Sequence, residues 1–136
     1  LSVQAQIMVQ LKELQAEFGI SLLFITHDLA AAEYLSNRVA VMYLGKLAEC
    51  APALNFSRNA KHPYSQGLIN AIPRMDPLIE RNRPAEILRG EVPSPINPPS
   101  GCRFHTRCPF AVERCRNEEP PLRRTADGHD IACWVV

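Results

Sequence analysis

The first third of the chain changes from helical to strand-like hydrophobic spacing. Apolar residues recur at positions 3, 7, 11, 14 and 18, the spacing of one helical face, and predict an amphipathic helix over Ser2 to Phe18. Ser2 is placed to cap this helix and Gly19 is placed to end it. The short apolar run Leu22 to Ile25 then favours a strand that is buried on both faces, as in a parallel sheet. We therefore expect a helix followed by a strand of an α/β fold.

Polar residues come directly after this strand. The strand is expected to end at Thr26 and to place Thr26, His27 and Asp28 at its carboxyl end, where open α/β sheets bind ligands. A simpler interpretation is that Asp28 caps the helix predicted over Leu29 to Ser36 and that His27 is a surface histidine without a function. The hydrophobic pattern alone does not decide between these two interpretations.

A β-hairpin and a third helix are predicted in the middle of the chain. Val39 to Leu44 is a β-rich run, Gly45-Lys46 supplies a turn, and Leu47 to Cys50 can return as a second strand. The string His62-Pro63-Tyr64 opens a helix, because a proline at the first helical position loses no hydrogen bond. Pro73 should stop that helix.

The chain becomes rich in proline after the third helix. Ten of the twelve prolines lie at or beyond position 73. Pro93, Pro95, Pro98 and Pro99 exclude regular hydrogen-bonded ladders, so residues 92–100 should form an extended, polyproline-like connector. The second half of the chain is therefore predicted to be a loop-rich tail.

Composition and charge narrow the classes of function. The 136 residues are 46% hydrophobic, and 15 basic residues against 14 acidic ones leave a net charge of +1. Without a basic excess, neither nucleic acid nor an anionic membrane surface is an expected partner. No apolar stretch approaches the roughly 20 residues that a spanning helix needs, and the N-terminus lacks a signal-peptide pattern. We therefore expect a cytosolic protein without direct membrane insertion.

Several segments of the chain carry a family resemblance. Leu23 to Leu29, with Arg38 to Leu47, is similar to the switch-histidine region of ATP-binding-cassette (ABC) ATPases of the oligopeptide and dipeptide importer branch. Leu1 to Gln6 resembles the segment after the D-loop in that family, and His62 to Ser65, with Pro93 to Pro95 and the cysteines beyond, resembles the branch's C-terminal extension. The resemblance implies an α/β fold in two parts. Residues 1–60 would be the C-terminal part of a P-loop ABC nucleotide-binding domain, and residues 61–136 the extension with its four-cysteine motif.

The resemblance also implies an activity and a role for one residue. The histidine that matches His27 contacts the γ-phosphate of ATP, as a sensor of that phosphate. In the family, the Walker A loop, the signature sequence and the Walker B strand with its glutamate lie upstream of Leu1, and no G-x-x-x-x-G-K-S/T motif occurs in this chain. ATP and Mg²⁺ would therefore be bound largely by other residues, and this polypeptide alone should be inactive. The parent protein would couple ATP binding and hydrolysis to the import of peptides or nickel.

The expected partners are implied by the same resemblance. They are a second ATP-binding subunit, in a homodimer or a heterodimer, the transmembrane permease subunits and, indirectly, a substrate-binding protein. Leu1 to Val3 would approach the nucleotide site of the opposite subunit, and the protein would lie on the cytoplasmic face of the membrane. The alternative is a free-standing small metal-binding module that uses the α/β part as a scaffold for protein interaction.

Four of the five cysteines form a second candidate site. They are spaced as Cys102-x5-Cys108-x6-Cys115-x17-Cys133. In a cytosolic protein this favours metal binding or burial over disulfides, and four thiolates suit either zinc or an iron-sulfur cluster. The spacing lacks the C-x2-C pair of many zinc sites, and the resembled family implies a [4Fe-4S] cluster, so we place the cluster first and zinc second. Two unrelated buried thiol pairs, or disulfides formed on oxidation, remain open.

The remaining cysteine and two histidines complete the candidates. His105 lies within the first gap of the motif and His129 precedes Cys133 by four residues, so either could replace a thiolate as a ligand. We nevertheless expect both imidazoles to be exposed. Cys50 has no cysteine near it in sequence and should be a small buried hydrophobic residue.

Overall fold

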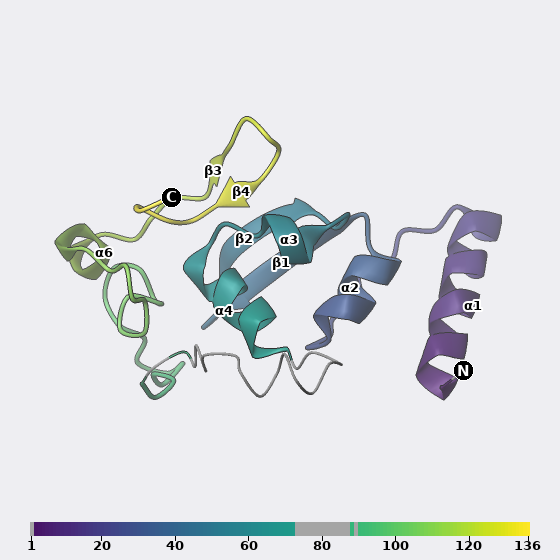
Figure 1. The fold of residues 1–136 in the computed structure, drawn as a ribbon, viewed down its shortest axis with the longest axis horizontal. Coiled ribbons are helices and arrows are strands. Elements are labelled where there is room, and N and C mark those ends of the chain that lie inside the picture. Colours follow the sequence, from purple (N-terminus) through teal and green to yellow (C-terminus); the bar gives the residue numbers. More distant parts are fainter. Residues whose placement is uncertain (1, 73–87, 89) are drawn as a thin grey trace, which may run out of the picture.

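The computed structural model describes residues 2–72, 88 and 90–136 (Figure 1). The chain begins with helix α1, Val3–Phe18, and helix α2, Leu29–Leu35. Strands β1, Arg38–Tyr43, and β2, Lys46–Pro52, come next, and then the helices α3, Phe56–Asn59, and α4, Pro63–Ala71. The C-terminal tail holds helix α6, Glu113–Asn117, and the two-residue strands β3, Arg123–Arg124, and β4, Asp130–Ile131. None of the helices in these ranges combines the length and the apolar character that a bilayer crossing requires.

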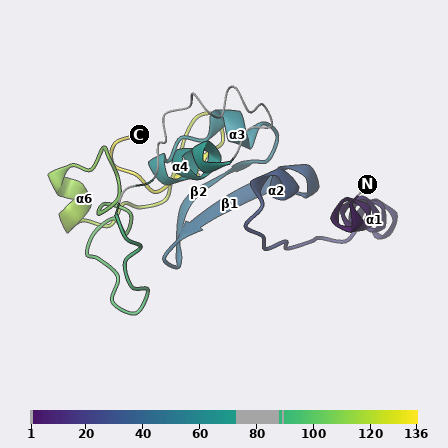
Figure 2. The same cartoon turned by 60° about the horizontal axis from the view of Figure 1, so that its bottom comes forward.

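Helix α1 forms where the hydrophobic spacing predicted it. The Ser2 hydroxyl accepts a hydrogen bond from the Ala5 backbone N–H at 3.2 Å, and Gly19 ends the helix in the left-handed conformation at φ 62°. No residue of α1 is buried. The helix stands beside α2, apart from the sheet (Figures 1 and 2). The sequence pattern of an apolar face is therefore present in α1, but none of that face is buried in the described structure.

The predicted strand at Leu22 to Ile25 is wrong for this chain. Residues 19–28 form a connector without helix or strand, in which Leu23 is 92% exposed and Ile25 is 88% exposed. A parallel strand is stable only when neighbouring strands satisfy its backbone and helices cover its faces. No strand among the described residues pairs with this segment, so its apolar side chains remain in solvent.

The sheet that does form is antiparallel throughout, with the strand order β1-β2-β4-β3. The predicted hairpin is confirmed, with a small shift of its turn. Tyr43 pairs with Lys46, so the two-residue connection is Leu44 and Gly45, at φ 45° and 78°. Both residues adopt the left-handed conformation that tight hairpin turns require. The resulting fold mixes helices with an antiparallel sheet, and the parallel strand expected from the sequence is absent from the described residues.

The apolar core lies on one face of the hairpin. It is built from buried residues of β1, of the end of β2, of the short segment after β2 and of the start of α3, namely Val39, Val41, Ala51, Ala53 and Phe56. Residues of α2 and α4 pack against this cluster, so these two helices and α3 cover the face (Figure 1). The other sheet face and the outer edge of β1 carry no such cover in the described structure.

Helix α4 begins as the sequence predicted. His62 lies at its cap, where the imidazole Nδ1 accepts a hydrogen bond from the Tyr64 backbone N–H at 3.0 Å, and Pro63 is the first helical residue. The helix ends at Ala71, and Pro73, which was expected to stop it, lies outside the described residues. Leu1, which we expected to help approach a second subunit, lies outside them as well.

The tail is held on the hairpin at two places. Near the hairpin turn, the buried Phe104 packs against Tyr43 and Tyr64, with ring centroids 5.3 Å and 5.2 Å away. Farther along, β4 lies beside β2 (Figure 1). Gly101, just before Phe104, permits the chain to pass close to α6, because it has φ 65° and a Cβ added there would lie 2.5 Å from the Cys115 carbonyl oxygen.

Candidate functional site

His27 is exposed at the end of the connector between α1 and α2. The turn that carries it is set by its neighbours. The Thr26 hydroxyl accepts a hydrogen bond from the Asp28 backbone N–H at 3.0 Å, and Asp28 Oδ1 accepts from the N–H groups of Ala30 and Ala31 at 3.0 and 3.1 Å. The simpler interpretation of Asp28 as the cap of α2 is therefore confirmed. The imidazole of His27 is presented to solvent, where a ligand could reach it.

The four cysteines of the predicted motif are all free thiols in the tail. Cys115 and Cys133 are buried, whereas Cys102 and Cys108 are half-buried. The first and third are joined through the backbone, since the Cys102 N–H donates to the Cys115 carbonyl at 2.8 Å. Long-range folding thus brings residues from three separate parts of the tail into one region of the molecule.

The thiols influence each other's ionisation. Burial raises the pKa of Cys102, a hydrogen bond from the Phe104 backbone N–H to its sulfur lowers that pKa, and the nearby thiols of Cys115, Cys133 and Cys108 raise it further. Burial likewise raises the pKa of Cys108, against a backbone hydrogen bond from Phe110. The sulfurs of Cys102 and Cys108 therefore lie within electrostatic reach of those of Cys115 and Cys133, and the pKa of both Cys102 and Cys108 is raised above its ordinary value.

The four cysteines have the chemistry that a thiolate-bound metal requires, but their side chains are not arranged around a common point. Four thiols, two of them receiving backbone N–H bonds, are the chemistry that zinc or an iron-sulfur cluster requires. Within residues 2–72, 88 and 90–136, however, no three His, Cys, Asp or Glu side chains are arranged so that they could bind one metal ion. The structure therefore supplies the ligands without an assembled site.

All three remaining expectations about cysteine and histidine need correction. Cys50 is half-buried rather than buried, and Arg38 Nη2 lies 3.4 Å from its sulfur. His129 is only 5% exposed, not a surface histidine. His105 is half-buried, with its Nδ1 2.8 Å from the Cys102 carbonyl oxygen. Neither histidine shares a metal-binding arrangement with the cysteines in the described part of the chain.

A buried polar cluster, which the sequence analysis did not identify, lies beside these cysteines. Glu49 of β2 has no exposed surface. Its Oε1 accepts a hydrogen bond from the Lys61 N–H at 2.9 Å and its Oε2 from the His62 N–H at 3.0 Å. His129 Nδ1 lies 2.9 Å from Oε1. The carboxylate therefore joins β2, the start of α4 and the C-terminal tail.

His62 belongs to the same cluster and is also buried. Burial lowers its pKa, whereas the charge of Glu49 and a hydrogen bond to the Ala132 backbone raise it, and burial dominates. The imidazole is thus held neutral while it caps α4 and contacts the residue before Cys133. The sequence signal that could have identified the cluster was the single carboxylate in the otherwise uncharged run from Leu47 to Pro52.

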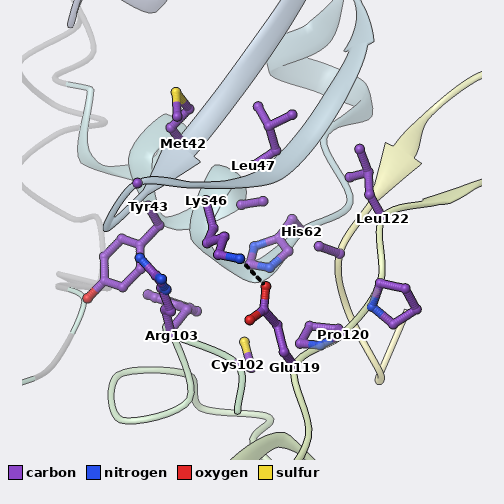
Figure 3. Close-up of a pocket in the computed structure, with 15 residues that line it drawn as sticks. Met42, Tyr43, Lys46, Leu47, His62, Cys102, Arg103, Glu119, Pro120 and Leu122 are labelled. Atoms are coloured by element: carbon purple, nitrogen blue, oxygen red, sulfur yellow. Dashed lines mark ion pairs between the residues drawn. The ribbon is translucent and has the colours of Figure 1, made fainter. Parts of the chain in front are cut away.

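A cavity of about 410 Å³ opens between the hairpin turn and the tail (Figure 3). Its walls are mostly apolar and include Met42, Leu47 and Leu122, with His62 and Cys102 among the polar lining residues. Lys46 Nζ and Glu119 Oε1 form an ion pair at 2.8 Å, which lowers the pKa of Glu119 (Figure 3). The segment that carries Cys102 therefore lies across this cavity from the hairpin.

Comparisons with known proteins find similarity along the chain. The model of the family described as "Oligopeptide/dipeptide transporter, C-terminal region" matches residues 48–115. A Sinorhizobium fredii protein named "Probable peptide ABC transporter ATP-binding protein y4tS" is 54% identical over 135 residues, which are 99% of this chain and 38% of that protein.

Two further relatives have the same extent. The oligopeptide transport ATP-binding protein OppF of Haemophilus influenzae is 48% identical over 136 residues, which are 100% of this chain and 41% of that protein. OppF of Salmonella typhimurium is 47% identical over 136 residues, which are 100% of this chain and 40% of that protein. The chain thus spans about two fifths of the length of these relatives.

Proposed function

Because this chain belongs to the family of oligopeptide/dipeptide transporter C-terminal regions, we propose that it is the C-terminal portion of the ATP-binding subunit of an ABC importer. The whole protein would couple ATP binding and hydrolysis to the transport of peptides, or of nickel. The observation that carries this proposal is the extent of the similarity. Relatives named as ATP-binding proteins of peptide transporters match 99% and 100% of the chain, which disfavours a free-standing metal-binding module.

The uncovered apolar surface at the N-terminal end supports the same proposal. Leu23 and Ile25 are exposed in a segment whose sequence favours a strand buried on both faces, and α1 buries none of its residues. In a whole nucleotide-binding domain, this segment would join a parallel sheet and α1 would pack beside it. The division into a nucleotide-binding part, 1–60, and an extension, 61–136, belongs to the proposal.

His27 would be the residue of this chain that senses ATP. It is exposed, and it follows the segment that we expect to become a strand in the whole domain. Such a strand would place His27 at the edge where α/β sheets bind ligands. Its imidazole would donate one hydrogen bond to the γ-phosphate, while ATP and Mg²⁺ are held mainly by residues outside this chain. The 136-residue polypeptide alone would therefore not hydrolyse ATP.

The substitution His27→Ala tests this assignment in the full-length subunit, assembled with its transporter. ATP binding should remain close to that of the wild type, and kcat should fall by roughly 100- to 1000-fold, because one hydrogen bond to the transition-state phosphate is lost. Glu113→Ala, at an exposed position in the first turn of α6, is the control and should keep its activity. Wild-type turnover of the His27→Ala variant would remove His27 from the nucleotide site.

The four-cysteine segment would add a metal centre to this subunit. Cys102, Cys108, Cys115 and Cys133 would hold a [4Fe-4S] cluster, or zinc as the second choice, and would have to draw closer together than they lie here. Their mutual electrostatic influence and the N–H bonds to two of the sulfurs support the proposal. The bound metal would stabilise a tail that has little regular secondary structure of its own.

Metal analysis of anaerobically purified full-length protein tests this centre. Iron with a brown colour that bleaches on reduction indicates the cluster, whereas a colourless protein with one equivalent of zinc indicates the alternative. A Cys→Ser change at any of the four positions should lose the metal. Cys50→Ser is the matched control and should retain it. Protein without iron or zinc, or equal metal loss in the Cys50 variant, would contradict the metal centre and leave these cysteines as thiols without a ligand role.

The partners and the location are part of the same proposal. The subunit would pair with a second ATP-binding subunit and bind transmembrane permease subunits, while a substrate-binding protein would act through the permeases. It would lie on the cytoplasmic face of the membrane. No feature of the near-neutral chain favours a nucleic-acid partner.

A further inference from the structure

The C-terminal tail joins the sheet through a very short strand. β4 pairs with β2 at only two register positions, Glu49 with Ile131 and Cys50 with Asp130. One more backbone hydrogen bond continues the contact, from the Ala132 N–H to the Ala48 carbonyl at 2.9 Å. So short a ladder at a sheet edge is marginal by itself, because few hydrogen bonds offset the entropy of ordering the chain. Side-chain contacts must therefore hold the tail in place.

Most ion pairs between the tail and the rest of the chain lie in solvent. Arg38 and Asp130 pair at 2.6 Å and Lys46 and Glu119 at 2.8 Å, and one or both side chains of each pair are well exposed. Lys61 and Asp127 form a third pair with one exposed partner. Exposed pairs of this kind are screened by water and salt and contribute little to stability.

The pair of Glu49 and His129 differs because both side chains are buried. They are 0% and 5% exposed, and 80 positions separate them in the sequence. A buried carboxylate is very unfavourable unless each oxygen has a partner. The backbone N–H groups of Lys61 and His62 donate one hydrogen bond to each oxygen of the Glu49 carboxylate. His129 adds a second partner for Oε1, and this is the buried contact that comes from the tail. Removing His129 leaves a buried charge with one partner fewer.

We propose that Glu49 and His129 are positioning residues that fix the tail on the hairpin and thereby place Cys133 among the other cysteines. Cys133 lies four residues beyond His129, and β4 lies between them. Its own carbonyl accepts a hydrogen bond from Arg123 Nη2 at 2.7 Å, which ties the backbone at Cys133 to β3. The buried pair thus connects the hairpin to the cysteine segment. This inference does not depend on whether the thiols bind a metal.

Hydrogen exchange and thiol alkylation in the metal-free full-length protein test the proposal. His129→Phe keeps an aromatic ring of similar volume and removes the nitrogen that contacts Glu49. Amides of residues 123–136 should then exchange about tenfold faster or more, and the alkylation rate of Cys133 should rise by a similar factor. Amides of the hairpin, residues 38–52, should change much less, since the core under α2 and α4 is untouched.

Two matched variants separate positioning from general destabilisation. In His129→Asn the side-chain amide nitrogen occupies the place of Nδ1 and can still donate to Glu49, so exchange and alkylation should return to within about threefold of wild type. Asp130→Asn removes an exposed ion pair on the neighbouring residue and should change both rates less than about twofold.

Each remaining outcome decides against the proposal. Unchanged tail exchange and Cys133 alkylation in His129→Phe would show that the buried pair does not hold the tail. Equal acceleration of the tail and of the hairpin would show that the pair stabilises the fold without positioning the cysteine. If the Phe variant does not fold, His129→Gln replaces it, because its donor lies one atom farther along the side chain. His129→Gln should loosen the tail more than His129→Asn, and the reverse order overturns the proposal.

Discussion

The two regions of this chain differ in how far their apolar residues are buried. From α2 onward, the hairpin carries its own core, in which Val39, Val41 and Phe56 are covered by helices of the same chain. Residues 2–27 have hydrophobic patterns just as regular but bury none of the helix and almost none of the connector. Two polar contacts join α1 to α2 and its cap residue, Gln4 with Asp28 at 3.4 Å and Lys12 over the Tyr34 ring at 4.3 Å.

The difference depends on where each region finds the partners that pair with it and cover it. A hairpin closes its hydrogen bonds with its neighbour in sequence, and short connections bring α3 and α4 back onto it. A strand of a parallel sheet must find its neighbours far away in sequence. The N-terminal region therefore has the pattern of a buried element, but no partner among the described residues buries it.

The largest expected effect is the loss of self-association when the first 27 residues are removed. The 136-residue polypeptide should self-associate through Leu23, Ile25 and the apolar face of α1, and a chain of residues 28–136 should be mainly monomeric at the same concentration. Sedimentation velocity measures the difference. Equal association of both chains would place the contact elsewhere, with the edge of β1 that no described strand pairs with as the next candidate.

Substitutions at Phe56 and Leu23 make the same contrast quantitative. Phe56→Ala in the core should lower the free energy of unfolding by about 3–5 kcal/mol. Leu23→Ala should change it by less than about 0.5 kcal/mol in the 136-residue chain, where Leu23 is 92% exposed.

The same Leu23→Ala change should cost about 2–5 kcal/mol in the full-length subunit, if the segment there becomes a buried strand. Denaturant unfolding of both proteins measures these values. A small effect of Leu23→Ala in the full-length protein would show that this segment remains exposed there and would contradict the proposed sheet.

Acidification should lower the free energy of unfolding only slightly through His62, the cap residue of α4. Its pKa lies below the ordinary value of 6.5 because the ring is buried. Above pH 6.5 the imidazole is neutral in both the folded and the unfolded chain, so it adds no pH dependence. Below that value the unfolded chain binds the proton more readily, and the free energy of unfolding falls by at most about 1.4 kcal/mol per pH unit for this one group.

His62→Asn provides the comparison for this pH effect. The asparagine oxygen can accept the hydrogen bond from the Tyr64 N–H as Nδ1 does, but the side chain does not titrate. The slope of stability between pH 6.5 and pH 5 should therefore be shallower than that of the wild type. Identical slopes would assign the acid sensitivity to other groups of the fold.

Local features of the fold could be predicted because neighbours in the sequence create them. Ser2 and Asp28 cap helices a few residues away, and Gly19 and Pro63 mark a helix end and a helix start. The hairpin could be recognised although its turn lies one residue earlier than predicted, because Gly45 takes part in the turn in either register. The four-cysteine motif was also visible as a spacing, since four cysteines in a proline-rich tail are unusual.

The helices, the hairpin and the cysteine spacing could thus be read from the chain alone, because caps, turns and periodicity act over a few residues. The remaining features depend on residues far apart in the chain, and the folded structure was needed to see them. The hydrophobic pattern did not reveal that Leu22 to Ile25 would find no strand partner in the part of the chain that the structure describes, since a strand exists only with its neighbours. Nor could it place His129 beside Glu49, 80 residues away, because burial and pairing of a charge are set by the packing of distant segments.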